Sequence, residues 1–132
     1  MIEIIKNMFI SSKKKIPSVV EKALFFQFPE AINIDWQIID NGYEAIFYNK
    51  EVEYIAKISK SGKLYEYKKN LNAKEVPLPI QNYCINLGEI MSAIAIYTIN
   101  DIIYELIIRN TSMIRFLLLF DINGNLLNKN QL

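Results

Sequence analysis

Two pairs of acidic side chains have a spacing at which carboxylates could cooperate in catalysis. Asp40 precedes Glu44 by four residues, and Asp101 precedes Glu105 by the same interval, each near the predicted end of a strand. Two neighbouring carboxylates can act as general acid and general base when their surroundings separate their pKa values. Acids near turns are more often simply solvated, so we interpret both pairs as turn acids, and an enzyme with an acid pair is the least favoured hypothesis.

The residues needed for nucleophilic triads and for zinc sites are missing from the sequence. The chain contains no histidine and a single cysteine, Cys84. Nucleophilic triads need a base beside the nucleophile, and zinc sites need several His or Cys ligands. Cys84 is therefore predicted to be a small residue on the buried face of a helix. The segment 121–125 resembles the start of a calcium loop, but the glycine at the sixth loop position and the closing bidentate glutamate are missing. We predict no enzymatic activity, no cofactor and no metal.

The charge balance excludes strongly electrostatic partners. Fifteen Lys and Arg against fourteen Asp and Glu leave a net charge of +1, so we expect neither nucleic acid nor an anionic membrane as partner. No stretch reaches the roughly 20 apolar residues that span a bilayer. The N-terminus has an acid at Glu3 and no sustained apolar core, unlike a secretory signal. The expected location is cytoplasmic if this N-terminus is native, and exported if a leader has been removed.

The apolar spacing predicts a helix followed by four strands. The helix begins at Pro17 and ends before Pro29, because proline suits the first turn of a helix and disfavours helical backbone in the residue before it. Between Ile34 and Tyr67, apolar residues alternate with polar ones in four short segments. The predicted hairpin turns lie at Asn41-Gly42, Asn49-Lys50 and Ser61-Gly62.

The same plan returns in the second half of the chain. Residues 70–75 are polar and are predicted to be a linker, and a second helix near Pro79 carries an apolar stripe that continues to Met91. The strands that follow are predicted at Ala93–Thr98, Ile102–Arg109, Met113–Phe120 and Asn125–Asn130.

Matching positions indicate an internal repeat. Pro17 and Pro79 are offset by 62 residues, as are Gly62 and Gly124. Neither half is expected to bury a sufficient core alone, so we predict one α+β domain over 16–132, built from half-repeats at about 16–70 and 76–130. Its eight antiparallel strands form one sheet with both helices packed on one face. Residues 1–15 are predicted to be a separate segment, either a short helix or an arm.

The second half has strands that are apolar on both faces. Ile102–Arg109 and Met113–Phe120 need cover on each side, yet the predicted helices cover only one. An uncovered apolar face usually marks an interface. A homodimer through the C-terminal sheet face and docking of residues 1–15 would each supply the cover. An apolar pocket beneath the helices, holding a small molecule or lipid, is the remaining alternative.

Several short motifs resemble a known family. They are Phe28-Pro29-x-Ala31-x-Asn33-Ile34-x-Trp36, Gly42-Tyr43-Glu44-Ala45-x-Phe47, Ala56-x-Ile58 before Gly62, and Phe120-Asp121-Ile122-Asn123-Gly124. Together they are similar to the PepSY-like domains, whose fold resembles beta-lactamase inhibitor protein. The resemblance covers roughly residues 16–130 and implies tandem helix-plus-four-strand units. It also implies a bacterial, periplasmic or secreted protein, and a few members of the family bind and inhibit enzymes through the exposed sheet. It supplies no catalytic residue.

Side chains that face away from the helices are the candidate contacts. We predict that Tyr48, Tyr65 and Tyr67, with Ile46 and Ile55 between them, bind a partner protein, because aromatic rings bring large contact area at little entropic cost. Trp36 is predicted to lie in the core. The predicted function is a non-enzymatic protein-binding module, with an enzyme inhibitor as its specific form; the alternative is a small-molecule or lipid carrier.

Overall fold

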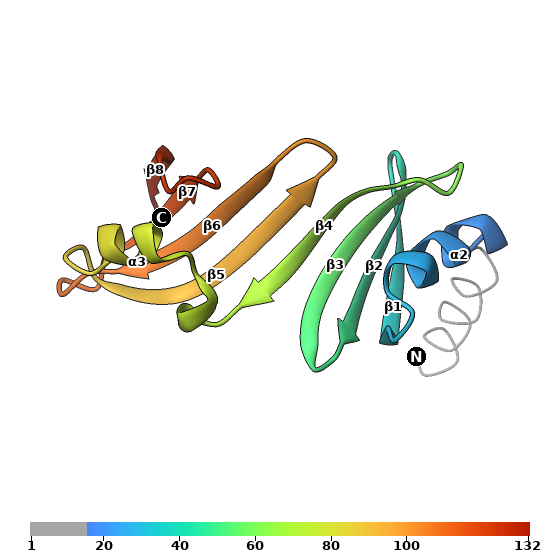
Figure 1. Ribbon diagram of the computed structural model, residues 1–132, viewed down its shortest axis with the longest axis horizontal. Coiled ribbons are helices and arrows are strands. Elements are labelled where there is room, and N and C mark those ends of the chain that lie inside the picture. The colour runs from blue at the N-terminus through green and yellow to red at the C-terminus, as the bar shows by residue number, and fades with distance from the viewer. Residues whose placement is uncertain (1–15) are drawn as a thin grey trace, which may run out of the picture. The chain divides into compact units, whose positions relative to one another are not determined.

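The computed structural model describes residues 16–132 (Figure 1), so the predicted N-terminal segment 1–15 lies outside the described residues. In chain order the elements are α2 (Ser18–Gln27), β1 (Ile32–Ile39), β2 (Gly42–Asn49), β3 (Val52–Ser59), β4 (Leu64–Leu71), the 3-10 helix η1 (Ala73–Glu75), α3 (Leu78–Cys84), β5 (Glu89–Thr98), β6 (Ile102–Arg109), β7 (Arg115–Phe120) and β8 (Leu126–Gln131). In this described part, no helix is long and apolar enough to cross a bilayer.

The strands form an eight-stranded sheet in sequence order, β1 to β8, and the registers are antiparallel. The predicted α+β class with an eight-stranded antiparallel sheet is therefore confirmed. The chain divides into two compact units, Met1–Tyr67 and Lys68–Leu132, called unit 1 and unit 2 below. In each unit the helix packs on one face of the strands, as predicted.

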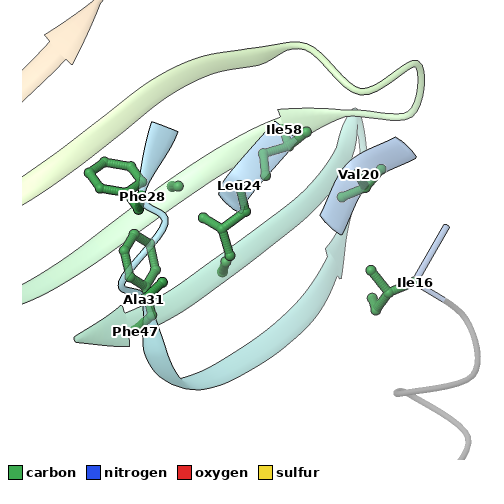
Figure 2. Close-up of a cluster of buried hydrophobic side chains, with 9 residues drawn as sticks. Ile16, Val20, Leu24, Phe28, Ala31, Phe47 and Ile58 are labelled. Carbon is green, nitrogen blue, oxygen red and sulfur yellow. The ribbon is translucent and has the colours of Figure 1, made fainter. Parts of the chain in front are cut away.

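In unit 1, α2 packs on β2 and β3 through a small number of buried side chains. Val20 and Leu24 of α2 are fully buried, and Phe47 and Ile58 meet them from the strands (Figure 2). Ala45 and Ala56, which lie directly opposite each other in the register, are also fully buried, and their small side chains leave room for the helix to approach the sheet. Burial of each large aliphatic side chain contributes about 1.5–3 kcal/mol.

Phe28 holds the end of α2 against the strands. It follows the last helical turn, and its ring centroid lies 5.0 Å from Phe47, 4.9 Å from Tyr54 and 5.2 Å from Tyr67. Aromatic pairs at such separations add about 0.5–1.5 kcal/mol beyond the area they bury. Pro29 prevents the helix from continuing past this anchor, so the sequence determines the end of α2 at the point where the ring must enter the core.

In unit 2, the shorter helix α3 packs on the strands in the same way. Ile80 and Cys84 of α3 are buried against Leu106, Leu118 and Phe120 of the strands. These three strand residues are fully buried, because alternate side chains along β6 and β7 point toward α3. The space beneath α3 is thus occupied by core side chains.

The second helix is shorter than the apolar stripe predicts. It ends at Cys84, and Ile90 and Met91, assigned to its stripe from the sequence, belong to β5. Gly88 explains the change: a Cβ at this position would lie 2.3 Å from the carbonyl oxygen of Arg109. Only glycine permits this close approach of two backbones, so Gly88 opens a strand rather than weakening a helix.

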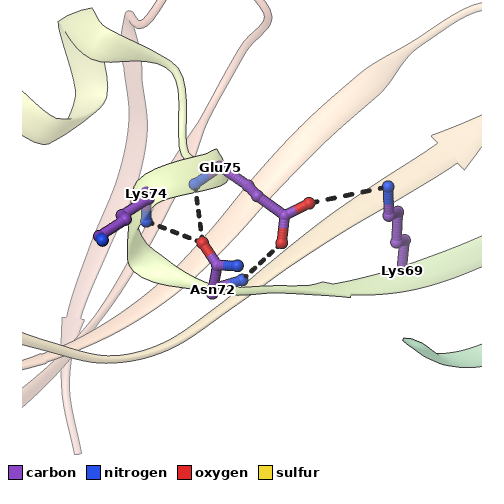
Figure 3. A network of polar contacts seen from close by, with 4 residues as sticks. All are labelled: Lys69, Asn72, Lys74 and Glu75. Atoms are coloured by element: carbon purple, nitrogen blue, oxygen red, sulfur yellow. Dashed lines mark hydrogen bonds and ion pairs between the residues drawn. The ribbon is translucent and has the colours of Figure 1, made fainter. Parts of the chain in front are cut away.

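The segment predicted as a polar linker is ordered by hydrogen bonds (Figure 3). β4 continues to Leu71, and Asn72 then caps η1 by accepting from the backbone N–H groups of Lys74 at 3.0 Å and Glu75 at 3.1 Å. The Glu75 carboxylate accepts from the Asn72 N–H at 3.0 Å, which completes a capping box, and lies 3.9 Å from Lys69 Nζ. The polar side chains of the predicted linker therefore end one element and begin the next.

The single-domain prediction can be tested with a core variant in unit 2. Leu118→Ala removes a fully buried side chain and should cost about 2–5 kcal/mol. If both halves unfold together, the fluorescence of Trp36 in unit 1 will report a lower urea midpoint for this variant.

Leu127→Ala is the matched control, because Leu127 is 54% exposed and its loss should change stability by no more than about 0.5 kcal/mol. An unchanged Trp36 transition beside a lowered circular-dichroism transition would show that the two halves unfold independently.

Candidate functional site

The acid pairs singled out in the sequence do not converge. Asp40 lies in the turn before β2, whereas Glu44 lies opposite Lys57 in the β2–β3 register. Asp101 ends the β5–β6 turn, and Glu105 lies four residues further along β6, a separation of about 13 Å between backbone positions. Among residues 16–132, no group of three or more His, Cys, Asp or Glu side chains is placed to hold a metal ion.

Asp121 braces a turn. Its Oδ1 accepts hydrogen bonds from the backbone N–H groups of Asn123 and Asn125, at 2.9 Å each, and its Oδ2 accepts from Asn125 Nδ2 at 3.1 Å. The hydrogen bonds from Asn125, backbone first and side chain second, lower the pKa of Asp121 below its ordinary value. Both carboxylate oxygens are already engaged, so the predicted hairpin turn is the role that the geometry supports.

Two other turns use the same geometry with different side chains. Asn110 Oδ1 accepts from the N–H groups of Ser112 at 2.9 Å and Ile114 at 3.0 Å. Ser59 Oγ accepts from the Lys63 N–H at 3.0 Å, in the turn that corresponds to that of Asp121. In all three turns the first residue also accepts, through its carbonyl oxygen, from the N–H three residues later. In this turn of unit 1, Ser59 thus takes the position that Asp121 has in the turn of unit 2.

Cys84 is the buried residue that the sequence predicts. It is 1% exposed, and burial raises the pKa of its thiol, which disfavours the thiolate. An open hollow of about 350 Å³ lies at the C-terminal end of α3, lined by Cys84 and Ile85 together with the polar side chains of Gln81, Asn82 and Glu89. Because a deep apolar pocket is the usual mark of a small-molecule site, this hollow is a weak candidate.

The open face of unit 1 has an apolar centre with charged neighbours. Ile46 and Ile55 lie directly opposite each other on β2 and β3, and Tyr48 follows Ile46 on the same side. Tyr48 is 42% exposed, and its hydroxyl lies 3.5 Å from an oxygen of Glu53. We call this surface the β2–β3 face; its members are Asp35, Glu44, Ile46, Tyr48, Glu53, Ile55 and Lys57.

One of the predicted contacts, Tyr67, packs on the helix side of the strands instead. Tyr67 packs edge-on against Phe28 and contacts Tyr54, so it lies with the core cluster under α2 and its prediction as an outward-facing residue was wrong. An aromatic in a β-strand fits a core as readily as a surface, so the sequence could not decide. Tyr65 is half-buried in β4 and stays a predicted contact. Trp36 packs against the core cluster, as predicted.

The open face of unit 2 is mainly aliphatic. We call it the β5–β7 face; its members are Ile94 and Ile96 of β5, Ile103, Glu105 and Ile107 of β6, and Leu117 and Leu119 of β7. Each is half-buried by its neighbours in the sheet, and α3 packs on the other side. Within residues 16–132 no helix covers this face, as the sequence predicts.

Known structures share this fold at low sequence identity. A protein from Bacteroides eggerthii, provisionally described as periplasmic, is 18% identical with a TM-score of 0.79, and the match covers 88% of each chain. A DUF2874 family protein from Bacteroides uniformis is 16% identical with a TM-score of 0.78, over 87% of this chain and 88% of that one.

A BLIP-like protein from Bacteroides fragilis is 15% identical with a TM-score of 0.77, over 89% of this chain and 86% of that one. No protein-family model matches the sequence, and no curated protein matches it either. The chain therefore has a BLIP-like fold, which confirms at the level of the fold the resemblance found in the sequence.

The turn at Asp121 gives a prediction about pH. Because the folded-state pKa of Asp121 is lowered, its ionised form stabilises the fold above the ordinary aspartate pKa of 3.8, and this contribution is lost as pH falls through the lower folded value. An NMR titration of the Asp121 carboxyl should give a pKa below 3.8.

Asp121→Asn is the matched variant, since Asn110 performs the same task in its own turn. Its unfolding free energy should fall less between pH 5 and pH 2 than that of the native chain. An equal fall in both proteins would show that the Asp121 hydrogen bonds do not contribute.

Proposed function

We propose that this chain is a protein-binding module without catalytic activity and that its β2–β3 face binds the partner. The observation that carries the proposal is the apolar centre of Ile46 and Ile55 beside the exposed ring of Tyr48, with charged side chains around them. Protein interfaces commonly combine an apolar, aromatic core with a polar rim. Tyr65 is also proposed to contact the partner, whereas Tyr67 packs on Phe28 and is not part of this surface.

The charges of this face indicate the chemistry of the partner. Asp35, Glu44 and Glu53 are acidic, and the one lysine of the face, Lys57, lies 3.4 Å from Glu66 and is thereby neutralised. The partner is accordingly a protein that presents basic side chains around an apolar or aromatic projection. Complementary charges of this kind increase the rate of association and select between partners.

The specific role we propose is restraint of an enzyme. Support comes from the shared fold with a BLIP-like protein from Bacteroides fragilis and from the continuous antiparallel pairing of β2 with β3, which fixes the side chains of the β2–β3 face before a partner binds. We propose a periplasmic or secreted location for the protein, which rests on the likeness to the Bacteroides eggerthii protein provisionally described as periplasmic.

The alternative function as a small-molecule or lipid carrier has less support. It requires an apolar pocket beneath the helices of the C-terminal half, where Ile80, Leu106, Leu118 and Phe120 are fully buried and pack together. The hollow beside Cys84 is open to solvent and has the polar side chains of Gln81, Asn82 and Glu89 among its lining residues. Neither place encloses a ligand as carrier sites do.

The second uncovered surface, the β5–β7 face, supports a further part of the proposal. We propose that it also binds protein, in the form of self-association. Six aliphatic side chains on one face, without a helix over them in residues 16–132, form the kind of surface that proteins bury in an interface.

Affinity capture tests the β2–β3 face. The native chain and the double variant Ile46→Ala with Tyr48→Ala are used as baits against the lysate and the exported fraction of the source organism. Because truncation of an interface hot spot costs about 2 kcal/mol or more, we expect recovery of the partner to fall at least about tenfold with the variant. Quantitative mass spectrometry of the eluates measures this.

A matched control removes an exposed aromatic and an exposed isoleucine elsewhere. Phe26 on α2 is 91% exposed and Ile38 on β1 is 60% exposed, so Phe26→Ala with Ile38→Ala should leave capture unchanged. Equal recovery with both double variants would count against the β2–β3 face. If a captured enzyme keeps full activity when saturated with the native chain, the inhibitor role is wrong even though binding stands.

A further inference from the structure

The side chains of the β5–β7 face are arranged in rows across the strands. Ile96 lies opposite Ile103 in the first row, and Glu105 lies between Ile94 and Leu119 in the second. The third row pairs Ile107 with Leu117. In the fourth row, Arg109 lies between Glu89 and Arg115. Glu105 thus lies near one end of the aliphatic surface, and the row beyond its other end has two bases and one acid.

Glu105 is an unusual member of such a surface. Its side chain is half-buried, with aliphatic neighbours on both adjacent strands, and it makes no hydrogen bond or ion pair with another residue of the described chain. A charge that is partly removed from water without a counter-ion is costly. A cation supplied from outside the unit would remove that cost.

In the described part of the chain, Arg115 is a base without a counter-ion, as Glu105 is an acid without one. It is exposed and faces a like charge, Arg109, whose guanidinium is already paired with Glu89 at 3.2 Å. Among residues 16–132, Arg115 makes no ion pair of its own. The Arg109–Arg115 row lies four residues along β6 from Glu105, or about 13 Å, and the row of Ile107 and Leu117 lies between them.

We propose that the β5–β7 face is covered by a second copy of this chain in a two-fold arrangement. A two-fold interface places the same patch against itself, so a patch suits it when an acid and a base lie at equal distances on either side of the axis. When the two-fold axis runs along the Ile107–Leu117 row, between the two sheets, Glu105 of each copy meets Arg115 of the other. The two ion pairs then flank an aliphatic centre, an inference that rests on the proposed use of this face for protein binding.

Two other occupants satisfy the charges less well. Residues 1–15 carry apolar side chains and the basic run Lys13–Lys15, which could neutralise Glu105 but would add positive charge beside Arg115. An acyl chain would cover the aliphatic residues and leave Glu105 without a counter-ion. A second copy is the one occupant that neutralises both charges with the same contact.

Charge exchange tests the arrangement by solution mass, measured by sedimentation equilibrium on the full chain. The native chain should give a dimer. E105R and R115E should each raise the dissociation constant at least about a hundredfold, because each sets like charges together twice per dimer. The double variant E105R/R115E restores both pairs and should dimerise again.

Mixing the two single variants separates the proposal from simple misfolding. An E105R chain opposite an R115E chain has an acid facing a base at both contacts, so the mixture should form heterodimers although each variant alone is monomeric. Native mass spectrometry identifies the mixed species. A native chain that is monomeric across the micromolar range, an E105R variant that dimerises normally, or a mixture without heterodimer would each overturn the proposal.

The same variants separate this inference from the binding of another protein at unit 1. Ile46→Ala with Tyr48→Ala should remain dimeric, since neither residue belongs to the β5–β7 face. E105R should still capture the heterologous partner. Loss of the dimer with capture intact is thus expected for E105R, and loss of capture with the dimer intact is expected for Ile46→Ala with Tyr48→Ala. A native chain that captures the partner but is monomeric would refute the two-fold contact alone. A native dimer whose capture is unchanged by Ile46→Ala with Tyr48→Ala would refute the β2–β3 site alone.

Discussion

One constraint governs both units: a single short helix covers one face of its strands, and the other face has no helix over it in residues 16–132. α2 buries its side chains against β2 and β3, and α3 buries its side chains against β6 and β7. An antiparallel sheet tolerates this when its second face is polar enough for water, and otherwise that face needs a partner. The chemistry of the two open faces therefore determines what the protein can bind.

The two units meet this constraint differently. On the β2–β3 face, charged residues surround Ile46 and Ile55, so water and a partner are both acceptable there. On the β5–β7 face, six aliphatic side chains lie together with Glu105, and Arg109 and Arg115 lie in the row beyond them, so water is a poor neighbour of the aliphatic part. The two units thus expose faces of different character, one with mixed charged and apolar side chains and one that is almost wholly aliphatic.

Strand alternation and turn residues predicted most of the fold, and the errors have physical causes. The spacing of apolar residues predicts the α2 helix but does not show which of them face the strands: the structure buries Val20 and Leu24, while Phe26 is 91% exposed. Gly42 is needed less for its turn than for the neighbouring strand, because a Cβ there would lie 2.2 Å from the carbonyl oxygen of Ile58. Such close approaches depend on strand pairing, which a linear sequence does not display. The β2–β3 face was predicted from alternation alone, and the pairing of charges across strands was not.

The two outermost strands have a consequence for assembly. β8 exposes all its side chains and carries Lys129, and the β7–β8 pairing is interrupted between Leu119 and Phe120; β1 has a similar irregularity between Ile32 and Asp35. Bulged, polar edges are poor templates for adding further strands. Growth into fibres by the addition of strands, the usual hazard of an open β-sheet, is thereby disfavoured at both edges.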